Sequence, residues 1–194
     1  MIKAVIFDLD GTLLNRDESL NIFIDKRGYV WKDKVYQELV AEFEITGLTW
    51  EDLLQDYISQ FQNSCVAFPS LISMLGELKN SKLLLGIITN GKGQFQMDNI
   101  RALGIERYFD IILISEWERM KKPEPQIFKK ALEEIDVLPN ESIFIGDHPE
   151  NDVMAARSVG MIGVWKKDYQ WKNVNADFIV EDLREVPSIV KRLN

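Results

Sequence analysis

The sequence is poor in cysteine and in long apolar runs, and both shortages exclude whole classes of protein. A single cysteine, Cys65, rules out an internal disulfide framework and is typical of a reducing cytosol. No apolar run approaches the length of a membrane span, because the longest are only strand-sized. Met1 leads almost directly into the first apolar run, so we expect no signal peptide. We therefore expect a cytoplasmic protein without a membrane anchor.

Basic residues are also in the minority. The chain has 23 Lys and Arg against 31 Asp and Glu, which gives a formal net charge of -8. Because nucleic acids and membrane surfaces are themselves anionic, this balance argues against either as a partner. With 194 residues, 46% of them hydrophobic, the chain is long enough for one domain with a sizeable insertion. The sequence does not choose between a monomer and a homodimer.

What the sequence does contain is a series of short apolar runs separated by helical patterns. The runs cover residues 4–7, 83–88, 111–114, 143–145 and 161–165. The helical patterns between the later runs cover residues 95–103, 127–135 and 153–159. This alternation predicts an α/β fold, with a parallel sheet of about five strands and helices on both faces.

The interval from residue 15 to residue 80 breaks this alternation, because it holds several helical patterns and no convincing strand. Its apolar stripes are Leu20, Phe23 and Ile24, then Val35, Leu39 and Phe43, then Leu53, Leu54, Tyr57, Ile58 and Phe61, and a last helix over 71–78. We expect residues 15–80 to form an inserted helical bundle. Residues 1–14 and 81–194 would then form the core.

Polar residues stand where the predicted strands end. They are Asp8 and Asp10 after the first strand, Thr89 and Asn90 after the second, Lys122 after the third, and Asp147 and Asp152 after the fourth. Ligands of open α/β sheets bind at these carboxyl ends. Two acids spaced two residues apart point the same way and need a cation or a shared proton nearby. This is the arrangement of a metal-assisted nucleophile beside an acid/base group.

With these motifs in this order, the sequence resembles a haloacid dehalogenase (HAD) superfamily hydrolase of the phosphatase branch. The resemblance covers about residues 1–14 and 83–165, whereas the insertion matches the family's small α-helical cap (C1-type, subfamily I) only in location and type. It implies a Rossmann-like, HAD-like fold. It also implies a Mg²⁺-dependent phosphatase that hydrolyses a small phosphorylated metabolite through an aspartyl-phosphate.

The resemblance assigns the central chemistry to three aspartates. Asp8 would be the nucleophile, and Asp10 would be the general acid for the leaving alcohol and then the base for water. Mg²⁺ would be held by Asp8, Asp147 and the backbone carbonyl of Asp10.

The remaining positions would bind phosphate or support the centre. Thr89 would offer its hydroxyl, the turn through Asn90 and Gly91 would offer N–H groups, and Lys122 would supply positive charge. Asp152 would orient waters or Lys122, and the Thr12 hydroxyl would fix the turn after the two acids.

Asp10 also discriminates among reactions. A halide leaves without a proton, and dehalogenases lack an acid at this position, so Asp10 favours phosphoryl chemistry. Three alternatives stay open: a sugar-phosphate mutase, a phosphonate hydrolase with a cap lysine as Schiff base, and a non-catalytic HAD-like binding protein. Which phosphomonoester is the substrate stays undetermined, because specificity would lie in the insertion.

Three other residues are less informative. We expect His148, the only histidine, to lie at the rim of the site or in a turn, because magnesium prefers oxygen ligands to a histidine nitrogen. Cys65 fits a small packing residue. Arg16 is one of several basic residues at the start of the insertion that could hold an anionic leaving group, although most charged helix residues face water.

Overall fold

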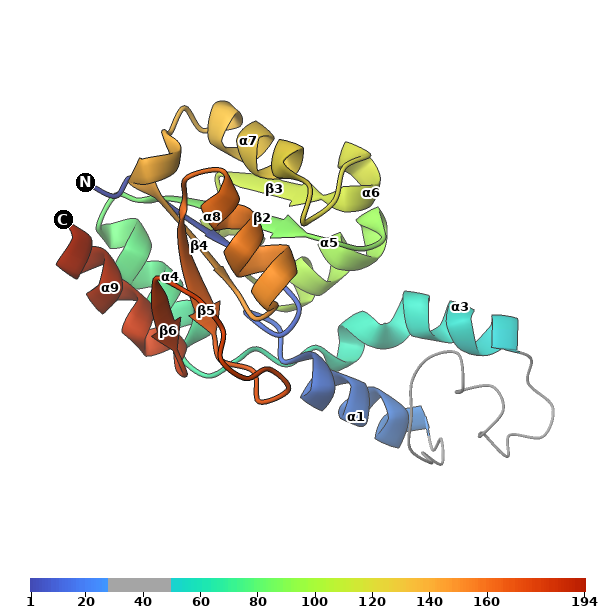
Figure 1. Cartoon of the computed structure of the whole chain (residues 1–194). Helices are drawn as coiled ribbons and strands as arrows, with labels where there is room; N and C mark the ends of the chain where they lie inside the picture. The colour runs from blue at the N-terminus through green and yellow to red at the C-terminus, as the bar shows by residue number, and fades with distance from the viewer. Residues whose placement is uncertain (28–49) are drawn as a thin grey trace.

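The computed structural model describes residues 1–27 and 50–194, and within them the chain forms one parallel sheet (Figure 1). Its strands are β1 (Ala4–Phe7), β2 (Leu84–Thr89), β3 (Ile111–Ile114), β4 (Ser142–Gly146), β5 (Ile162–Lys166) and β6 (Phe178–Val180). They lie in the order β3-β2-β1-β4-β5-β6, and every pair is parallel. The predicted α/β fold is confirmed, with one strand more than expected. Strand β6 has three residues, too few to give a recognisable pattern.

The strand order reverses between β1 and β4. From β1 the chain moves outward through β2 and β3, and it then returns to the other side of β1 for β4, β5 and β6. Connections on the two sides of such a point diverge and leave a crevice at the carboxyl ends of the central strands. The loops that follow β1 and β4 are therefore brought together by the topology.

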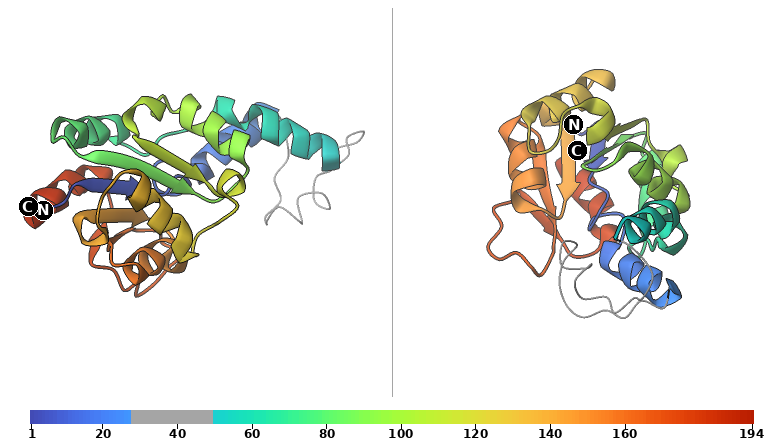
Figure 2. Two further views of the ribbon diagram at one scale, coloured as in Figure 1. Left: turned by 90° about the horizontal axis from the view of Figure 1, so that it is seen from above. Right: turned by 90° about the vertical axis from the view of Figure 1, so that its right-hand side faces the viewer.

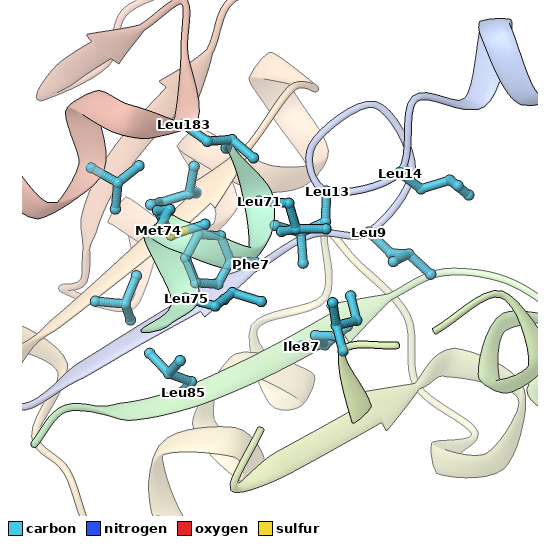
Figure 3. Packing of buried hydrophobic residues seen from close by; sticks show 14 of the residues in the cluster. Phe7, Leu9, Leu13, Leu14, Leu71, Met74, Leu75, Leu85, Ile87 and Leu183 are labelled. Atoms are coloured by element: carbon cyan, nitrogen blue, oxygen red, sulfur yellow. The ribbon is translucent and has the colours of Figure 1, made fainter. Parts of the chain in front are cut away.

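Helices cover both faces of the sheet (Figure 2). Helices α4 (Leu71–Asn80), α5 (Gly93–Ala102) and α9 (Val186–Leu193) pack on the face to which Val5 and Phe7 point. Helices α7 (Pro125–Glu134) and α8 (Ala155–Ser158) pack on the opposite face, against Ala4 and Ile6. Because β1 is buried on both faces, it reads as an unbroken apolar run. Figure 3 shows Phe7 surrounded by side chains of α4 and β2.

The packing of helix α4 bears on where the insertion ends. The sequence places this helix in the inserted bundle, but Leu71, Met74, Leu75 and Leu78 belong to the buried core of the sheet face (Figure 3). Its stripe of Leu and Met indicates that one face of the helix is buried. The stripe does not indicate which part of the protein this face packs against. The packing favours an insertion that ends before Leu71. The division into 1–14 with 81–194 and 15–80 otherwise stays a prediction.

The described part of the insertion contains α1 (Arg16–Arg27), α3 (Trp50–Gln60) and a 3₁₀ turn (Phe61–Ser64), which lie to one side of the sheet in Figure 1. An aromatic cluster holds them together and to α5. Ring centroids lie 5.6 Å apart for Phe23 and Tyr57, 4.9 Å for Tyr57 and Phe61, and 5.6 Å for Phe61 and Phe95. The predicted stripe of Val35, Leu39 and Phe43 lies outside the described residues.

The remaining elements are short. They are α6 (Ser115–Glu118), the 3₁₀ turns Glu106–Tyr108, Pro139–Glu141 and Leu183–Glu185, and a π-helical turn, Pro149–Met154. This π-helical turn and α8 together replace the continuous helix predicted over 153–159. Among the described residues, no helix has both the length and the apolar character needed to cross a bilayer.

Candidate active site

The site lies at the carboxyl ends of β1 and β4, where the strand order reverses. Asp8 follows β1 directly, and its N–H donates to Ile145 O (2.8 Å), which fixes it beside the end of β4. Asp147 follows β4, and Asp152 lies in the π-helical turn just beyond. Carboxylate oxygens of Asp8, Asp147 and Asp152 lie within 4.8 Å of one another. The sheet thus brings together three acids that the sequence places up to 144 positions apart.

A buried lysine neutralises part of this acidic cluster. Lys122 Nζ lies 2.5 Å from Asp8 Oδ1 and 2.7 Å from Asp152 Oδ1, and all three side chains are at most 8% exposed. Burial lowers the pKa of Lys122, but the charges of Asp152 and Asp8 outweigh it and hold that pKa above its usual value. Lys122 is therefore a permanent cation in contact with Asp8. Burial raises the pKa of Asp8, and Lys122 opposes this only in part.

The charge and chemistry of this cluster fit a divalent cation. Three carboxylates and one ammonium leave a net charge of minus two when all are ionised. Burial, with the Asp152 charge nearby, raises the pKa of Asp147 to about 7, so a further positive charge would stabilise the ionised form of Asp147. Oxygen ligands of this kind suit a hard cation. Gly11 keeps room for Asp147, because a Cβ there would lie 2.4 Å from Asp147 Oδ2.

Asp152 supports the cluster with both of its oxygens. Oδ1 accepts from Lys122, and Oδ2 accepts from the His148 N–H (3.0 Å). Gly146 is required for this approach, because a Cβ at that position would lie 2.3 Å from Asp152 Oδ2. Asp152 thus fixes both Lys122 and the loop that carries Asp147.

Within residues 1–27 and 50–194, the side chains of His148 and Cys65 make no hydrogen bond to the acidic cluster, although the His148 backbone N–H does. His148 Nδ1 accepts from the N–H groups of Glu150 and Asn151, both at 3.2 Å, so the histidine caps the π-helical turn as a turn residue would. Burial, with Asp10 nearby, raises the pKa of Cys65 to about 12. Its thiol therefore stays protonated and is a poor nucleophile.

Asp10 lies apart from the acidic cluster and is held from two sides. Arg16 Nη1, on α1, lies 3.1 Å from Asp10 Oδ1, and Gln96 Nε2, on α5, lies 2.6 Å from Asp10 Oδ2. Arg16 Nη2 also donates to Tyr57 OH at 3.1 Å, which connects Asp10 to both described helices of the insertion. In the sequence, Arg16 is only one of several basic residues at the start of the insertion. Gln96 could not be predicted as a site residue, because nothing in the local pattern separates it from Gln94, the other glutamine of α5.

Thr89 and Asn90 lie in the site, but their side chains already have protein partners. Thr89 Oγ1 accepts from Gln96 Nε2 at 2.8 Å. The Asn90 amide binds the backbone of Lys122 twice, from Nδ2 to the carbonyl and from the Lys122 N–H to Oδ1, both at 2.9 Å. The Gly91 N–H, expected to face phosphate, donates to Ser115 Oγ at 3.0 Å. Asn90 therefore positions Lys122 through its side chain.

Thr12 departs from expectation. Its side chain is fully buried, yet the hydroxyl has no hydrogen-bond partner within residues 1–27 and 50–194. The turn after the two acids is held by its backbone instead, with Gly11 N–H donating to Leu14 O (2.9 Å) and Leu13 N–H donating to Leu9 O (2.9 Å). Gly11 has φ +78°, which other residues seldom adopt. The predicted hydroxyl contact is thus wrong for the described residues.

Comparison with known proteins places this arrangement in a family. A family model described as haloacid dehalogenase-like hydrolase matches residues 5–165. The chain is similar to glyceraldehyde 3-phosphate phosphatase of Pyrococcus furiosus, with 29% identity over 100% of this chain and 95% of the relative. It is 34% identical to phosphoserine phosphatase of Thermus thermophilus over 61% of this chain and 49% of the relative.

A solved structure agrees with these matches. The crystal structure of a HAD phosphatase from Thermococcus onnurineus is similar to this chain with a TM-score of 0.73 and 26% identity, covering 97% of this chain and 98% of the other. The chain therefore belongs to the haloacid dehalogenase-like hydrolase family, on its phosphatase branch.

Proposed function

We propose that this phosphatase hydrolyses a small alkyl phosphomonoester through an aspartyl-phosphate on Asp8, with Mg²⁺ as its cofactor. The observation that carries the proposal is the buried contact of Lys122 with both Asp8 and Asp152, at the crevice between β1 and β4. A permanently charged lysine against a buried carboxylate gives a phosphoryl group two things it needs, a nucleophile and a countercharge.

In the first step, an oxygen of Asp8 attacks phosphorus and the ester P–O bond breaks. Asp10 gives its proton to the departing alkoxide, which leaves as the alcohol. In the second step, water attacks phosphorus, its proton passes to Asp10, and the P–O bond to Asp8 breaks. Lys122 stays charged throughout and offsets the negative charge of the equatorial phosphoryl oxygens.

The acidic cluster supports magnesium as the divalent cation. Asp8 and Asp147, with the backbone carbonyl of Asp10, supply the hard oxygen ligands that Mg²⁺ takes, and Mg²⁺ would neutralise phosphoryl oxygens that Lys122 alone cannot. Both oxygens of Asp152 accept hydrogen bonds, one from Lys122 and one from the His148 N–H. We therefore assign Asp152 the role of positioning Lys122 and the loop that carries Asp147.

The leaving group would pass between the core and the insertion. Asp10 contacts Arg16, which in turn contacts Tyr57 of α3, so the alcohol part of the substrate would lie against α1 and α3. The two curated relatives carry names that specify small alkyl phosphates, glyceraldehyde 3-phosphate and phosphoserine. These observations support a metabolite-sized substrate, and the single cysteine supports a cytoplasmic location.

A panel of phosphorylated metabolites, assayed for phosphate release with Mg²⁺ and with a chelator, tests the proposal. We expect Mg²⁺-dependent release of phosphate from at least one small alkyl ester. Asp8→Asn should abolish it, and Asp98→Asn, a half-buried aspartate on α5 outside the acidic cluster, should not change it. Equal activity of Asp8→Asn and the wild type would overturn the assignment of Asp8. A phosphorylated isomer in place of free phosphate would favour a mutase.

A further inference from the structure

Gln96 is a buried glutamine on α5 that contacts three groups of the site at once. Its Nε2 lies 2.6 Å from Asp10 Oδ2, 2.8 Å from Thr89 Oγ1 and 3.2 Å from the Asn90 carbonyl oxygen. The residue is 2% exposed. A buried amide N–H aimed at a carboxylate forms a charge-assisted hydrogen bond, which is stronger than a bond between neutral groups.

The surroundings fix the orientation of the Gln96 amide. Oε1 accepts from Asn99 Nδ2 at 3.3 Å, and Asn99 Oδ1 accepts from Cys65 Sγ at 3.4 Å. Turning the amide over would place Oε1 against Asp10 Oδ2 and the Asn90 carbonyl oxygen, which are both acceptors, and Nε2 against the Asn99 amide nitrogen, which is a donor. The hydrogen-bond partners therefore favour the orientation that points the N–H groups into the site.

The backbone of the neighbouring turn leaves room for this side chain. A Cβ on Gly91 would lie 2.9 Å from Gln96 Cγ, and Gly91 has φ +149°. The helix itself is anchored at Phe95 in the aromatic cluster and at Ile100 in the core. Gln96 thus reaches Asp10 from helix α5 of the core, whereas Arg16 reaches it from the insertion.

We propose that Gln96 is a positioning residue that aims the Asp10 carboxyl at the leaving-group oxygen. This inference rests on the proposed function, in which Asp10 protonates the departing alkoxide. Oδ2 is held by Gln96 and Oδ1 by Arg16, so loss of the Gln96 amide lets the carboxyl rotate about its own side-chain bonds. A general acid that is misplaced by about 1 Å loses on the order of 100-fold in rate.

The loss of rate caused by a misplaced Asp10 depends on the leaving group. An alkoxide needs the proton of Asp10 as it departs, but a nitrophenolate is stable enough to leave without one. The kinetic constant kcat/KM covers only the steps up to the first irreversible one, here release of the alcohol or phenol. It therefore isolates the proton donation by Asp10 from its later action on water.

The test compares Gln96→Met with the wild type on an alkyl phosphate of the active panel and on p-nitrophenyl phosphate. Met has nearly the same length and no donor. We expect kcat/KM to fall about 100-fold for the alkyl ester. For the aryl ester we expect less than about a threefold change. Gln94→Leu, an exposed glutamine on the same helix, is the matched control and should change neither value.

Two further measurements keep the inference falsifiable. Gln96→Asn retains a donor but withdraws it by one methylene, so it should show the same selective loss to a smaller degree. In an Asp10→Asn background, Gln96→Met should cause no further loss on the alkyl ester. Equal loss on both esters, or no loss on either, would overturn the role of Gln96 and leave the proposed function standing. Failure of the wild type to hydrolyse any ester would instead overturn the proposed function, and the inference with it.

Discussion

Replacing Lys122 by Met removes the cation from the centre of the buried acidic cluster. In the wild type, Lys122 contacts Asp8 and Asp152 at 2.5 and 2.7 Å with every side chain nearly inaccessible. Methionine has a similar length, so the change removes charge and hydrogen bonds and leaves little cavity. Asp8, Asp147 and Asp152 then face one another, and within residues 1–27 and 50–194 no other lysine or arginine forms an ion pair with Asp8.

The cost follows from the burial of the pair. Breaking a buried ion pair by removing one partner costs about 3–5 kcal/mol, because the other charge stays buried and uncompensated. For a chain of this size, each kcal/mol lowers Tm by roughly 2–4 °C. We therefore expect Lys122→Met to lower Tm by roughly 6–20 °C in metal-free buffer near neutral pH.

Thermal unfolding followed by circular dichroism measures this change. Lys130→Met is the matched control, because Lys130 also contacts two carboxylates, Glu118 and Glu134, but its side chain is 37% exposed. Exposed pairs contribute about 0–1 kcal/mol, so the Tm of this control should move by no more than a few degrees. The difference in Tm between Lys122→Met and the wild type should become smaller as the pH falls. Burial raises the pKa of Asp8, so acid protonates this carboxylate and removes its uncompensated charge. Equal effects of the two lysine variants would refute the reasoning.

Three further predictions concern the metal, the support of Asp152 and the insertion. The pKa of Asp147 is raised from 3.8 to about 7 in the folded protein, so the fold binds a proton that the unfolded chain releases, and metal-free stability should fall as the pH rises through that interval. Mg²⁺ should accordingly raise Tm more above pH 7 than below pH 4, and an equal rise at both would contradict this. Gly146→Ala places a Cβ 2.3 Å from Asp152 Oδ2 and should lower kcat about 100-fold, whereas unchanged kcat would show that Asp152 tolerates displacement. Phe61→Ala empties a fully buried position between α1, α3 and α5 and should cost roughly 3–5 kcal/mol by urea denaturation, and a cost below about 1 kcal/mol would mean that the cluster does not anchor the insertion.

The fold was predictable where the signal was local. Strand β1 is buried on both faces and gives an unbroken apolar run, and the same holds for β2 and β4. The polar residues after these strands were predicted to meet because the carboxyl ends of parallel strands share one edge. Asp8, Lys122 and Asp152 do meet there.

Other features depend on contacts between distant segments, which a local pattern does not show. Helix α4 has an amphipathic stripe that indicates burial without naming the surface that buries it, and that surface is the sheet. Gln96 lies 86 positions from Asp10, and only the packing of α5 beside the turn after β1 brings them together. The hydroxyl of Thr12 suggested a hydrogen bond, but backbone groups hold its turn instead.

The most direct test of the account is to find the phosphoryl group on the enzyme. The protein is mixed with an active alkyl phosphate and Mg²⁺, quenched in acid during turnover, reduced with borohydride and analysed by peptide mass spectrometry. Reduction converts an aspartyl-phosphate to homoserine, and we predict homoserine at residue 8 and none at Asp10, Asp147 or Asp152. Modification of another residue, or none during turnover of the wild type, would contradict the account.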